Sequence, residues 1–288
     1  MQRVKEKAIQ LLKDGVVDRV IGWKAGEFFY DLTPAVFTTA EEVEKSFVWS
    51  VFSAANVSKY LIAESKKGGR IAAFLKPCDS YSFVQLCKEH RIAKENVYVV
   101  GVQCDGTCDI EKLKALGFKG VTGVEERGEE LLVSTLYGGK TAAKKDALLE
   151  RCTVCKSKRI AYFDELLGEQ GEDCGDARFE AVEKLEAMTP EERFAFWRGE
   201  LSRCIRCNAC RNVCPACSCE KCVFDNHALG TDNKAAADDF EENFFHIIRA
   251  FHVASRCTDC GECSRVCPQH IPLHLLNRKF IKDSNELY

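Results

Sequence analysis

Two cysteine runs with the same spacing constrain this chain more than any other feature. Each run reads C-x2-C-x2-C-x3-C-P; the first spans residues 204–215 and the second 257–268. In proteins with two four-iron clusters, each run supplies three thiolates to one cluster and its fourth cysteine to the other. We therefore predict one cluster on Cys204, Cys207, Cys210 and Cys267, and a second on Cys257, Cys260, Cys263 and Cys214.

Two other kinds of site share parts of this pattern. Paired C-x2-C segments also bind zinc, but two complete runs of four cysteines are far more specific for iron clusters. Cys210, Cys214 and Cys217 have the spacing of radical S-adenosylmethionine enzymes. Only 71 residues follow Cys217, too few for the barrel that this chemistry requires, so we reject that interpretation.

Several side chains close to the runs have no role fixed by the spacing. The small residues Ala209 and Gly261 would let the backbone approach the clusters. Neither ligand set uses Cys217, Cys219 or Cys222. Structural, buried and metal-binding roles all stay open for these three cysteines. Five arginines lie within the cluster loops. They are either a solvated surface or cations that stabilise the reduced clusters and dock an acidic partner: Arg203, Arg206, Arg211, Arg256 and Arg265.

The composition agrees with a cysteine-rich metalloprotein of a reducing compartment. The chain has 18 cysteines, and its N-terminus lacks the apolar core of a signal peptide. Its formal charge of −3 gives no reason to expect nucleic acid as a partner, and no apolar run is long enough to insert in a membrane. We expect a cytoplasmic protein, from an anaerobic host because iron clusters are oxygen-sensitive.

The first part of the chain alternates between strand and helix patterns, which favours a parallel or mixed sheet covered by helices. Strands are expected at 17–23, 70–75 and 96–104, with short β segments at 129–133 and 134–137. Helices are expected at 4–13, at 41–65 with a break near Asn56, and at 79–90, 109–116 and 141–151.

The organisation that follows is an α/β domain at 1–167, a linker at 168–188 and an α+β dicluster ferredoxin-like domain at 189–288. The linker is rich in Glu, Asp and Gly. Thr189, Pro190 and the acids behind them form a helix start, because Thr caps the first turn and Pro suits its first position. A further helix, rich in Phe, is expected at 238–255.

A third group of cysteines lies in the α/β domain. Cys78 and Cys104 each follow a predicted strand, and strand ends on one side of an α/β sheet are neighbours in space. With Cys152 and Cys155 they make four, enough for a third four-iron cluster. A redox dithiol at Cys152 and Cys155, or burial of Cys78 and Cys104 as apolar side chains, are the alternatives. We assign Cys87 and Cys174 to the buried class.

Four segments in order resemble a known family. They are LKDGVVDRVIGW at 12–23, Lys76-Pro77-Cys78, YVVGVQC at 98–104 and Cys152-x2-Cys155. The resemblance, over about residues 1–165, is to the beta subunits of coenzyme F-420-reducing hydrogenase and F-420-dependent formate dehydrogenase. It implies FAD beside a four-iron cluster on the four matching cysteines: Cys78, Cys104, Cys152 and Cys155. Cys104, at the strand end, matches better than Cys108.

The function expected from these features is that of an electron-transfer subunit without catalysis of its own, in a multi-subunit anaerobic oxidoreductase. It would relay electrons between a flavoprotein or metal catalytic subunit and a hydrogenase, formate dehydrogenase or heterodisulfide-reductase-like partner. The alternative is a flavin-bearing catalytic subunit acting on a diffusible hydride carrier such as coenzyme F-420. No G-x-G-x-x-G or P-loop assigns residues to a flavin. A redox sensor has no support, because no DNA-binding motif occurs.

Overall fold

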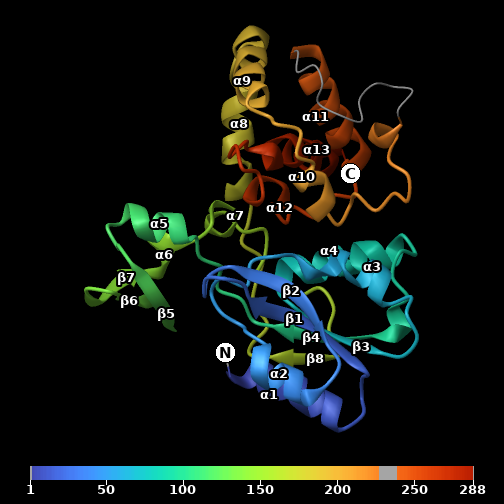
Figure 1. The fold of residues 1–288 in the computed structure, drawn as a ribbon. Coiled ribbons are helices and arrows are strands. Elements are labelled where there is room, and N and C mark those ends of the chain that lie inside the picture. The colour runs from blue at the N-terminus through green and yellow to red at the C-terminus, as the bar shows by residue number, and fades with distance from the viewer. Residues whose placement is uncertain (1, 227–238, 288) are drawn as a thin grey trace. The chain divides into compact units, whose positions relative to one another are not determined.

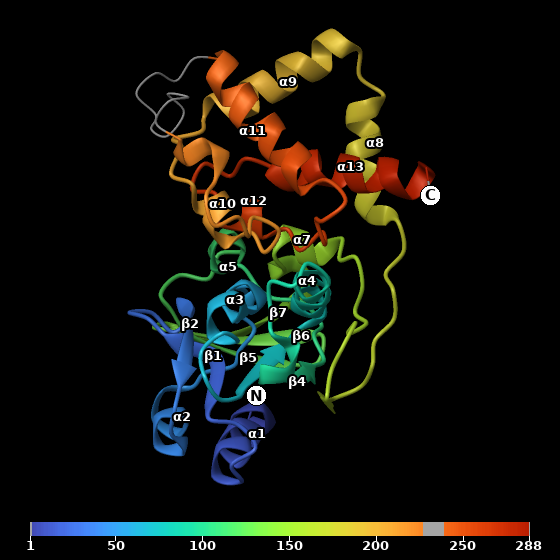
Figure 2. The same ribbon diagram turned by 90° about the vertical axis from the view of Figure 1, so that its right-hand side faces the viewer.

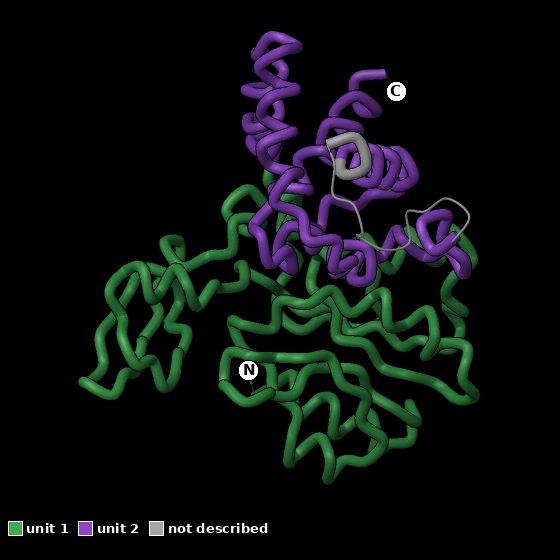
Figure 3. The backbone as a smooth tube through the Cα atoms, turned by 45° about the horizontal axis from the view of Figure 1, so that its top comes forward, with its two compact units in different colours: residues 1–174 green, residues 175–288 purple. Residues whose placement is uncertain are grey.

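The computed structural model describes residues 2–226 and 239–287 of the chain, with the side chains of 239–242 left out of the description. The chain divides into two compact units, residues 1–174 (unit 1) and 175–288 (unit 2) (Figure 3). Each unit is described by itself below.

Unit 1 is built on a five-stranded sheet with the order β2-β1-β3-β4-β8 (Figure 1). Strands β1, β3, β4 and β8 run parallel, and β2 pairs antiparallel with β1 at the edge. This confirms the expected mixed, mostly parallel α/β sheet. The bounds are β1 Arg19–Ala25, β2 Leu32–Phe37, β3 Ile71–Leu75, β4 Val97–Val102 and β8 Glu165–Leu167.

Helices cover both faces of this sheet, which explains why its central strands are apolar throughout. Helices α1 (Gln2–Lys13) and α2 (Ala40–Ser46) lie on one face, and α3 (Leu61–Glu64) and α4 (Pro77–Lys88) on the other (Figures 1 and 2). All five residues of β3 are buried. Short 3-10 turns, η1 (Val57–Lys59) and η2 (Lys94–Asn96), precede α3 and β4.

A smaller antiparallel sheet with the order β5-β6-β7 completes unit 1. Its strands are β5 Val121–Arg127, β6 Glu130–Thr135 and β7 Gly138–Ala143, accompanied by α5 (Ile110–Ala115), α6 (Lys144–Ala147) and α7 (Glu150–Thr153). The helix predicted at 141–151 is not continuous: only the short α6 and α7 are helical there. Residues 141–143 are the end of β7, where pairing with β6 outweighs the helix propensity of the two alanines.

Unit 2 consists of helices and loops in its described part. The Glu-rich stretch expected as a linker contains η3 (Ala177–Phe179) and α8 (Glu180–Glu186), and Val182 and Leu185 of α8 are buried beside Leu275. Helix α9 (Pro190–Ser202) begins with the expected cap: the Thr189 hydroxyl accepts from Glu192 N–H and the Glu192 carboxylate accepts from Thr189 N–H.

The remaining elements of unit 2 are α10 (Ala209–Val213), η4 (Val223–Asp225), α11 (Asp239–Val253), α12 (Glu262–Arg265) and α13 (Leu273–Leu287). Helix α11 matches the Phe-rich helix expected at 238–255, of which residue 238 lies outside the described residues. The strands that an α+β domain would add are not among the described elements of unit 2. Across the described parts of both units, no helix is long and apolar enough to cross a membrane.

Candidate metal centres

The two cysteine runs of unit 2 wind in the same way. Two residues after the first cysteine of each run, Arg206 and Asp259 have positive φ angles of 50° and 60°. Two residues later, Asn208 and Gly261 have φ angles of 60° and 67°, and a short helix starts immediately behind each. The repeated left-handed turns bend each run into a compact loop, as wrapping a cluster requires.

The first predicted ligand set meets around one small cavity in unit 2. Cys204, Cys207 and Cys210 of the first run line it together with Cys267 of the second. Cys204 and Cys210 are buried, whereas Cys207 is exposed. Burial raises the pKa of Cys210, and the neighbouring thiols of Cys267 and Cys207 raise it further, while Arg249 lowers it. The cavity thus has a donor set of four sulfurs, which fits a four-iron cluster.

The second predicted set gathers next to it. The thiols of Cys260 and Cys257 both act on the pKa of buried Cys214, after the larger effects of a hydrogen bond with Cys217 and burial. Burial, and then Cys260 and Cys263, raise the pKa of Cys257. Cys214 of the first run therefore lies among the cysteines of the second. These buried thiols keep their protons unless a metal binds them, because a thiolate is costly in an apolar site.

Hydrogen bonds and a buried ion pair hold these loops in place. The backbone N–H of Arg206 donates to Cys204 Sγ at 3.3 Å, and Asn277 Nδ2 donates to Cys263 Sγ at 3.8 Å. Asp259 accepts from Arg278 Nε at 2.9 Å, and both side chains are only 2% exposed. This pair fixes the left-handed turn of the second loop, and the N–H···S bonds are of the kind that stabilise cluster thiolates.

The five arginines near the runs are held within unit 2. Arg206 is buried with its guanidinium 4.2 Å from the centre of the Phe245 ring. Arg211 and Arg265 pair with Asp225 and Glu262 at 2.6 and 2.7 Å, Arg203 pairs with Glu200, and Arg256 donates to Ser218. Because carboxylates compensate three of these charges and one is buried, the arginines do not form the free basic docking surface that their number suggests.

The three cysteines left over from the runs have different surroundings. Cys217 is hydrogen-bonded to Cys214, beside the second predicted cluster. Cys222 is a hydrogen-bond partner of Arg211, which also binds Asp225. Cys219 is exposed. Of the three, Cys217 alone lies against the predicted ligands of both clusters, since it also acts on Cys210.

In unit 1, the structure places the third group of cysteines near one another. Cys78 lies in the first turn of α4, directly after β3, and Cys104 follows β4, the parallel neighbour of β3. Their thiols interact, Cys104 also interacts with Cys152, and Cys152 with Cys155. Burial raises the pKa of Cys78, of Cys104 and of Cys155. The fold thus assembles residues that no local motif connects.

The loop after β4 adds backbone donors to this group. Gly106 N–H is hydrogen-bonded to Cys104, and Thr107 donates to Cys152 Sγ from its N–H at 3.4 Å, with its hydroxyl at 3.3 Å. Burial opposes ionisation of Cys152, but Arg151 and these bonds lower its pKa below the ordinary value. Gly106 has a φ of 108°, a backbone conformation that other residues rarely adopt, and a Cβ there would lie 2.6 Å from the Leu148 side chain. Glycine therefore lets the loop adopt this turn close to Leu148. N–H···S bonds around clustered sulfurs fit a third iron cluster.

Two other cysteines of unit 1 have apolar surroundings. Cys108 belongs to a buried cluster with Leu113 and Leu131, and burial raises its pKa to about 12. Cys87 packs against the main core, and burial raises its pKa to about 11. Cys87 is partly buried, so its assignment to the buried class holds only in part, and the assignment of Cys174 to that class is wrong, because Cys174 is exposed. Cys104 is better placed than Cys108 as a ligand because it lines a cavity.

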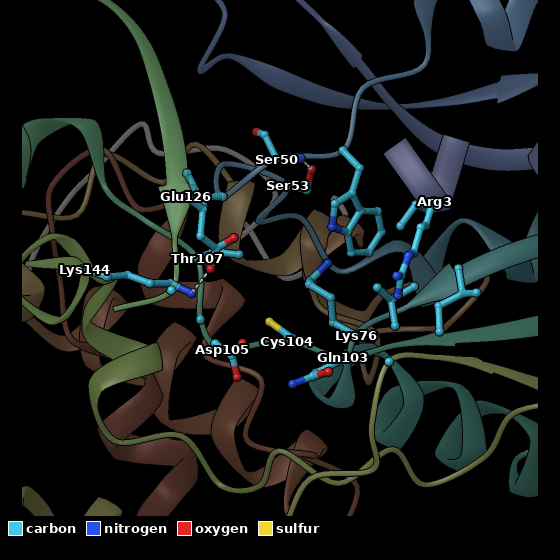
Figure 4. Close-up of a pocket in the computed structure, with 18 of the residues that line it drawn as sticks. Arg3, Ser50, Ser53, Lys76, Gln103, Cys104, Asp105, Thr107, Glu126 and Lys144 are labelled. Atoms are coloured by element: carbon cyan, nitrogen blue, oxygen red, sulfur yellow. Dashed lines mark hydrogen bonds and ion pairs between the residues drawn. The ribbon is translucent and has the colours of Figure 1, made fainter. Parts of the chain in front are cut away.

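That cavity, of about 470 Å³, lies in unit 1 at the carboxyl ends of β3, β4 and β8. Lys76, Gln103, Cys104 and Thr107 surround it, with Lys144 and Glu126 forming an ion pair nearby (Figure 4). Lys76 is buried, 2.8 Å from Asp79, and its ammonium lies 4.5 Å from the centre of the Trp23 ring. The carboxyl edge of parallel strands is the usual ligand site of α/β sheets, and the volume suits a cofactor-sized molecule.

Comparison with known proteins agrees with both halves of this description. The model of the 4Fe-4S dicluster domain matches residues 200–271, which include all eight cysteines of the two runs. The F-420-dependent formate dehydrogenase subunit beta of Methanocaldococcus jannaschii is 26% identical over 331 aligned positions, covering 94% of this chain and 86% of the relative. The chain is similar to the beta subunits of F-420-dependent formate dehydrogenase. The resemblance of its N-terminal segments to that family is confirmed, and the matched dicluster domain indicates iron–sulfur electron transfer.

Two further proteins are similar to this chain over less of their length. The F-420-dependent formate dehydrogenase 1 subunit beta of Methanococcus maripaludis is 26% identical, covering 74% of this chain and 71% of the relative. A chain in a structure of the F-420-reducing [NiFe] hydrogenase complex from Methanosarcina barkeri is 19% identical with a TM-score of 0.43; the match covers 53% of this chain and 58% of that chain.

The sequence did not reveal two features of the centres. Asn208, and not Ala209, has the backbone position that corresponds to Gly261. Arg249 of α11 is buried and donates to Cys210 Sγ at 3.2 Å. Its place four residues after Phe245, on one face of a predicted helix, was the available signal, but an arginine at that spacing usually faces solvent.

Proposed function

We propose that this chain relays electrons inside a multi-subunit oxidoreductase through two four-iron clusters in unit 2 and a third in unit 1. Bound clusters would supply one-electron transfer. Unit 2 would hold them through the sets Cys204, Cys207, Cys210, Cys267 and Cys257, Cys260, Cys263, Cys214, and unit 1 through Cys78, Cys104, Cys152 and Cys155.

The observation that supports this proposal is the position of the fourth cysteine of each run, which lies near the cysteines of the other run. Cys267 lines the cavity of the first run, and Cys214 lies among the thiols of the second. A pair of zinc sites needs no exchange of cysteines between the runs, because each run could close its own tetrahedron with four local cysteines. Two clusters that share ligands crosswise lie close together, and this supports electron transfer between them.

The relatives support the proposed partners, because their names make them beta subunits of F-420-dependent formate dehydrogenases. We propose that this chain docks between a flavin or metal catalytic subunit and a hydrogenase, formate dehydrogenase or heterodisulfide-reductase-like partner. In that role its own residues bind and tune clusters and do not transform a substrate. Anaerobic co-purification from the host, with mass spectrometry of the bound subunits, tests this; recovery of the chain alone would contradict it.

The crosswise assignment is tested by EPR of the full chain, reconstituted anaerobically. Cys214→Ser should damage the cluster held by the 257–263 loop, and Cys267→Ser the one held by the 204–210 loop. Cys219→Ser, at an exposed cysteine outside both sets, is the control and should leave both signals unchanged. Loss confined to the cluster of the mutated run itself would refute the assignment.

A second candidate is a flavin-bearing catalytic subunit that oxidises or reduces a hydride carrier such as coenzyme F-420. The cavity of unit 1 favours it, because Cys104 lies on the wall of a cofactor-sized space. Lys76 and Thr107 would orient a polar ring there, and a flavin would exchange hydride for single electrons.

The flavin content of the protein purified anaerobically separates the two candidates. Near-stoichiometric flavin, lost in a variant with Gly106→Val that fills the loop beside the cavity, would favour the catalytic subunit. If the protein has its full iron content but no flavin, even after incubation with FAD, the electron relay is the remaining candidate of the two.

A further inference from the structure

Arg249 is a buried cation beside Cys210, one of the predicted cluster ligands of unit 2. It lies in α11 and is 6% exposed. Its Nη1 donates to Cys210 Sγ at 3.2 Å and its Nη2 to the Cys210 carbonyl oxygen at 3.4 Å. Its third donor, Nε–H, is buried without an acceptor within the described residues. A buried donor of this kind beside a ligand sulfur is suited to an acceptor that the protein atoms do not provide.

The charge of Arg249 acts on both ligand sets. Burial opposes a charged guanidinium, yet the thiols of Cys210, Cys217, Cys214 and Cys263 together raise its pKa above the ordinary value. Cys210 belongs to the first predicted cluster, and Cys214 and Cys263 to the second. Cys210, which Arg249 contacts, packs in one buried cluster of side chains with Cys263, so the cation lies near both sets. Arg249 therefore acts on the clusters through its charge. The cation is held close to ligands of both sites, and these buried surroundings screen charge poorly.

Neighbouring side chains hold Arg249 in this position. The ring of Phe245, one turn earlier on α11, lies 5.9 Å from its guanidinium, and the guanidinium of Arg206 is 4.2 Å from the same ring. Phe245 is 2% exposed. Since α11 belongs to the segment between the two runs, Arg249 adds a buried cation from outside the cysteine loops to the arginines that the loops themselves contain.

Reduction adds a negative charge to a cluster, and its potential rises with nearby positive charge and with hydrogen bonds to its sulfurs. We propose that Arg249 is a shared counter-charge that raises the reduction potentials of both clusters, and of the one bound by Cys210 most strongly. This inference rests on the proposed function, because it requires both crosswise ligand sets.

The test is an EPR-monitored redox titration of the full chain, reconstituted anaerobically, with iron and sulfide counted in each variant. Arg249→Gln should lower both potentials, with the larger shift at the cluster bound by Cys210. Arg249→Lys keeps the positive charge but loses the two hydrogen bonds of the guanidinium to Cys210. Only the potential of the cluster bound by Cys210 should then fall, and by less than in Arg249→Gln. Arg193→Gln is the matched control: its guanidinium donates to the carbonyl oxygens of Leu185 and Glu186, and both potentials should stay at the wild-type values.

The outcomes separate this inference from the proposed function. Cluster-loaded Arg249→Gln with wild-type potentials would overturn the inference and leave the relay intact. If Arg249→Gln fails to load clusters, Arg249→Lys decides: a shift confined to the Cys210 cluster supports the inference, and an absent or equal shift at both overturns it. A wild-type chain that binds no clusters would overturn the proposed function and the inference with it.

Discussion

Asn208 has the same left-handed backbone conformation in the first cysteine run as Gly261 has in the second. Their φ and ψ angles are 60° and 7° for Asn208 and 67° and 6° for Gly261. Each residue directly follows the second cysteine of its run and precedes a short helix. The two runs are thus equivalent in backbone as well as in spacing, although the side chains at this position differ.

This equivalence predicts opposite effects of two substitutions. Gly261→Ala places a Cβ where left-handed backbone is costly and should destabilise the cluster-loaded chain by about 1–2 kcal/mol. Asn208→Gly should cost nothing or stabilise slightly, because glycine adopts this conformation freely. Anaerobic chemical unfolding measures both.

A glycine in ordinary helix provides the control. Gly199 of α9 has open space around its missing Cβ, so Gly199→Ala should stabilise by roughly 0.5–1 kcal/mol. If Gly261→Ala and Asn208→Gly lower the free energy of unfolding by equal amounts, the two turns are not equivalent.

The buried Lys76–Asp79 pair predicts a strong stability effect in unit 1. The atoms are 2.8 Å apart, Lys76 is 2% exposed, and its ammonium also donates to the Ala55 carbonyl oxygen. Lys76→Met should cost about 3–5 kcal/mol because it leaves a buried carboxylate unpaired. The double variant Lys76→Met with Asp79→Leu should recover much of that loss in unfolding experiments; an additive loss would contradict the ion-pair account.

His274 predicts a pH dependence of stability in unit 2. Burial, and then Arg278, lower its pKa from 6.5 to about 4, and the ring accepts or donates at Ser264 Oγ, 2.8 Å away. The folded state favours the neutral His274 ring. The stabilisation that follows is complete above pH 6.5 and is lost as the pH falls towards 4. The full effect is on the order of 3 kcal/mol. His274→Gln should flatten that part of the curve of unfolding free energy against pH; an unchanged slope would contradict it.

The cysteines outside the predicted sets should differ in reactivity. The pKa values of Cys87 and Cys108, raised to about 11 and about 12, keep both protonated at pH 8, and only thiolates alkylate rapidly. Exposed Cys174 and Cys219 should react first with iodoacetamide in the cluster-loaded chain. Peptide mass spectrometry over time measures this order, and early labelling of Cys108 would contradict its burial.

The sequence was informative wherever function depends on local spacing. The two cysteine runs predicted crosswise ligand sets that the structure brings together, and the Thr189 cap predicted the start of α9. Apolar runs located β3 and β4, and the adjacency of their ends follows from parallel pairing. These features are encoded in a few neighbouring residues, so no tertiary information was needed.

Features that depend on distant contacts were missed. Strand β2 contains Pro34, which argues against a strand, yet β2 is an edge strand, where a missing N–H is tolerated. The helix expected at 41–65 ends at Ser46, because Phe47 and Val48 pair with the backbone of β1. The cavity beside Cys104 combines residues from 3 to 168, which no sequence window contains.

The most direct measurement for the whole account is the iron content of the full chain after anaerobic reconstitution, for wild type and Cys104→Ser. Three clusters require about twelve irons per chain. Cys104→Ser should lower the count to about eight and spare both EPR signals of unit 2, whereas Cys108→Ser, in the apolar cluster, should stay near the wild-type count. About eight irons in the wild type would contradict the third cluster, and zinc in place of iron in protein isolated from its host would contradict the electron relay itself.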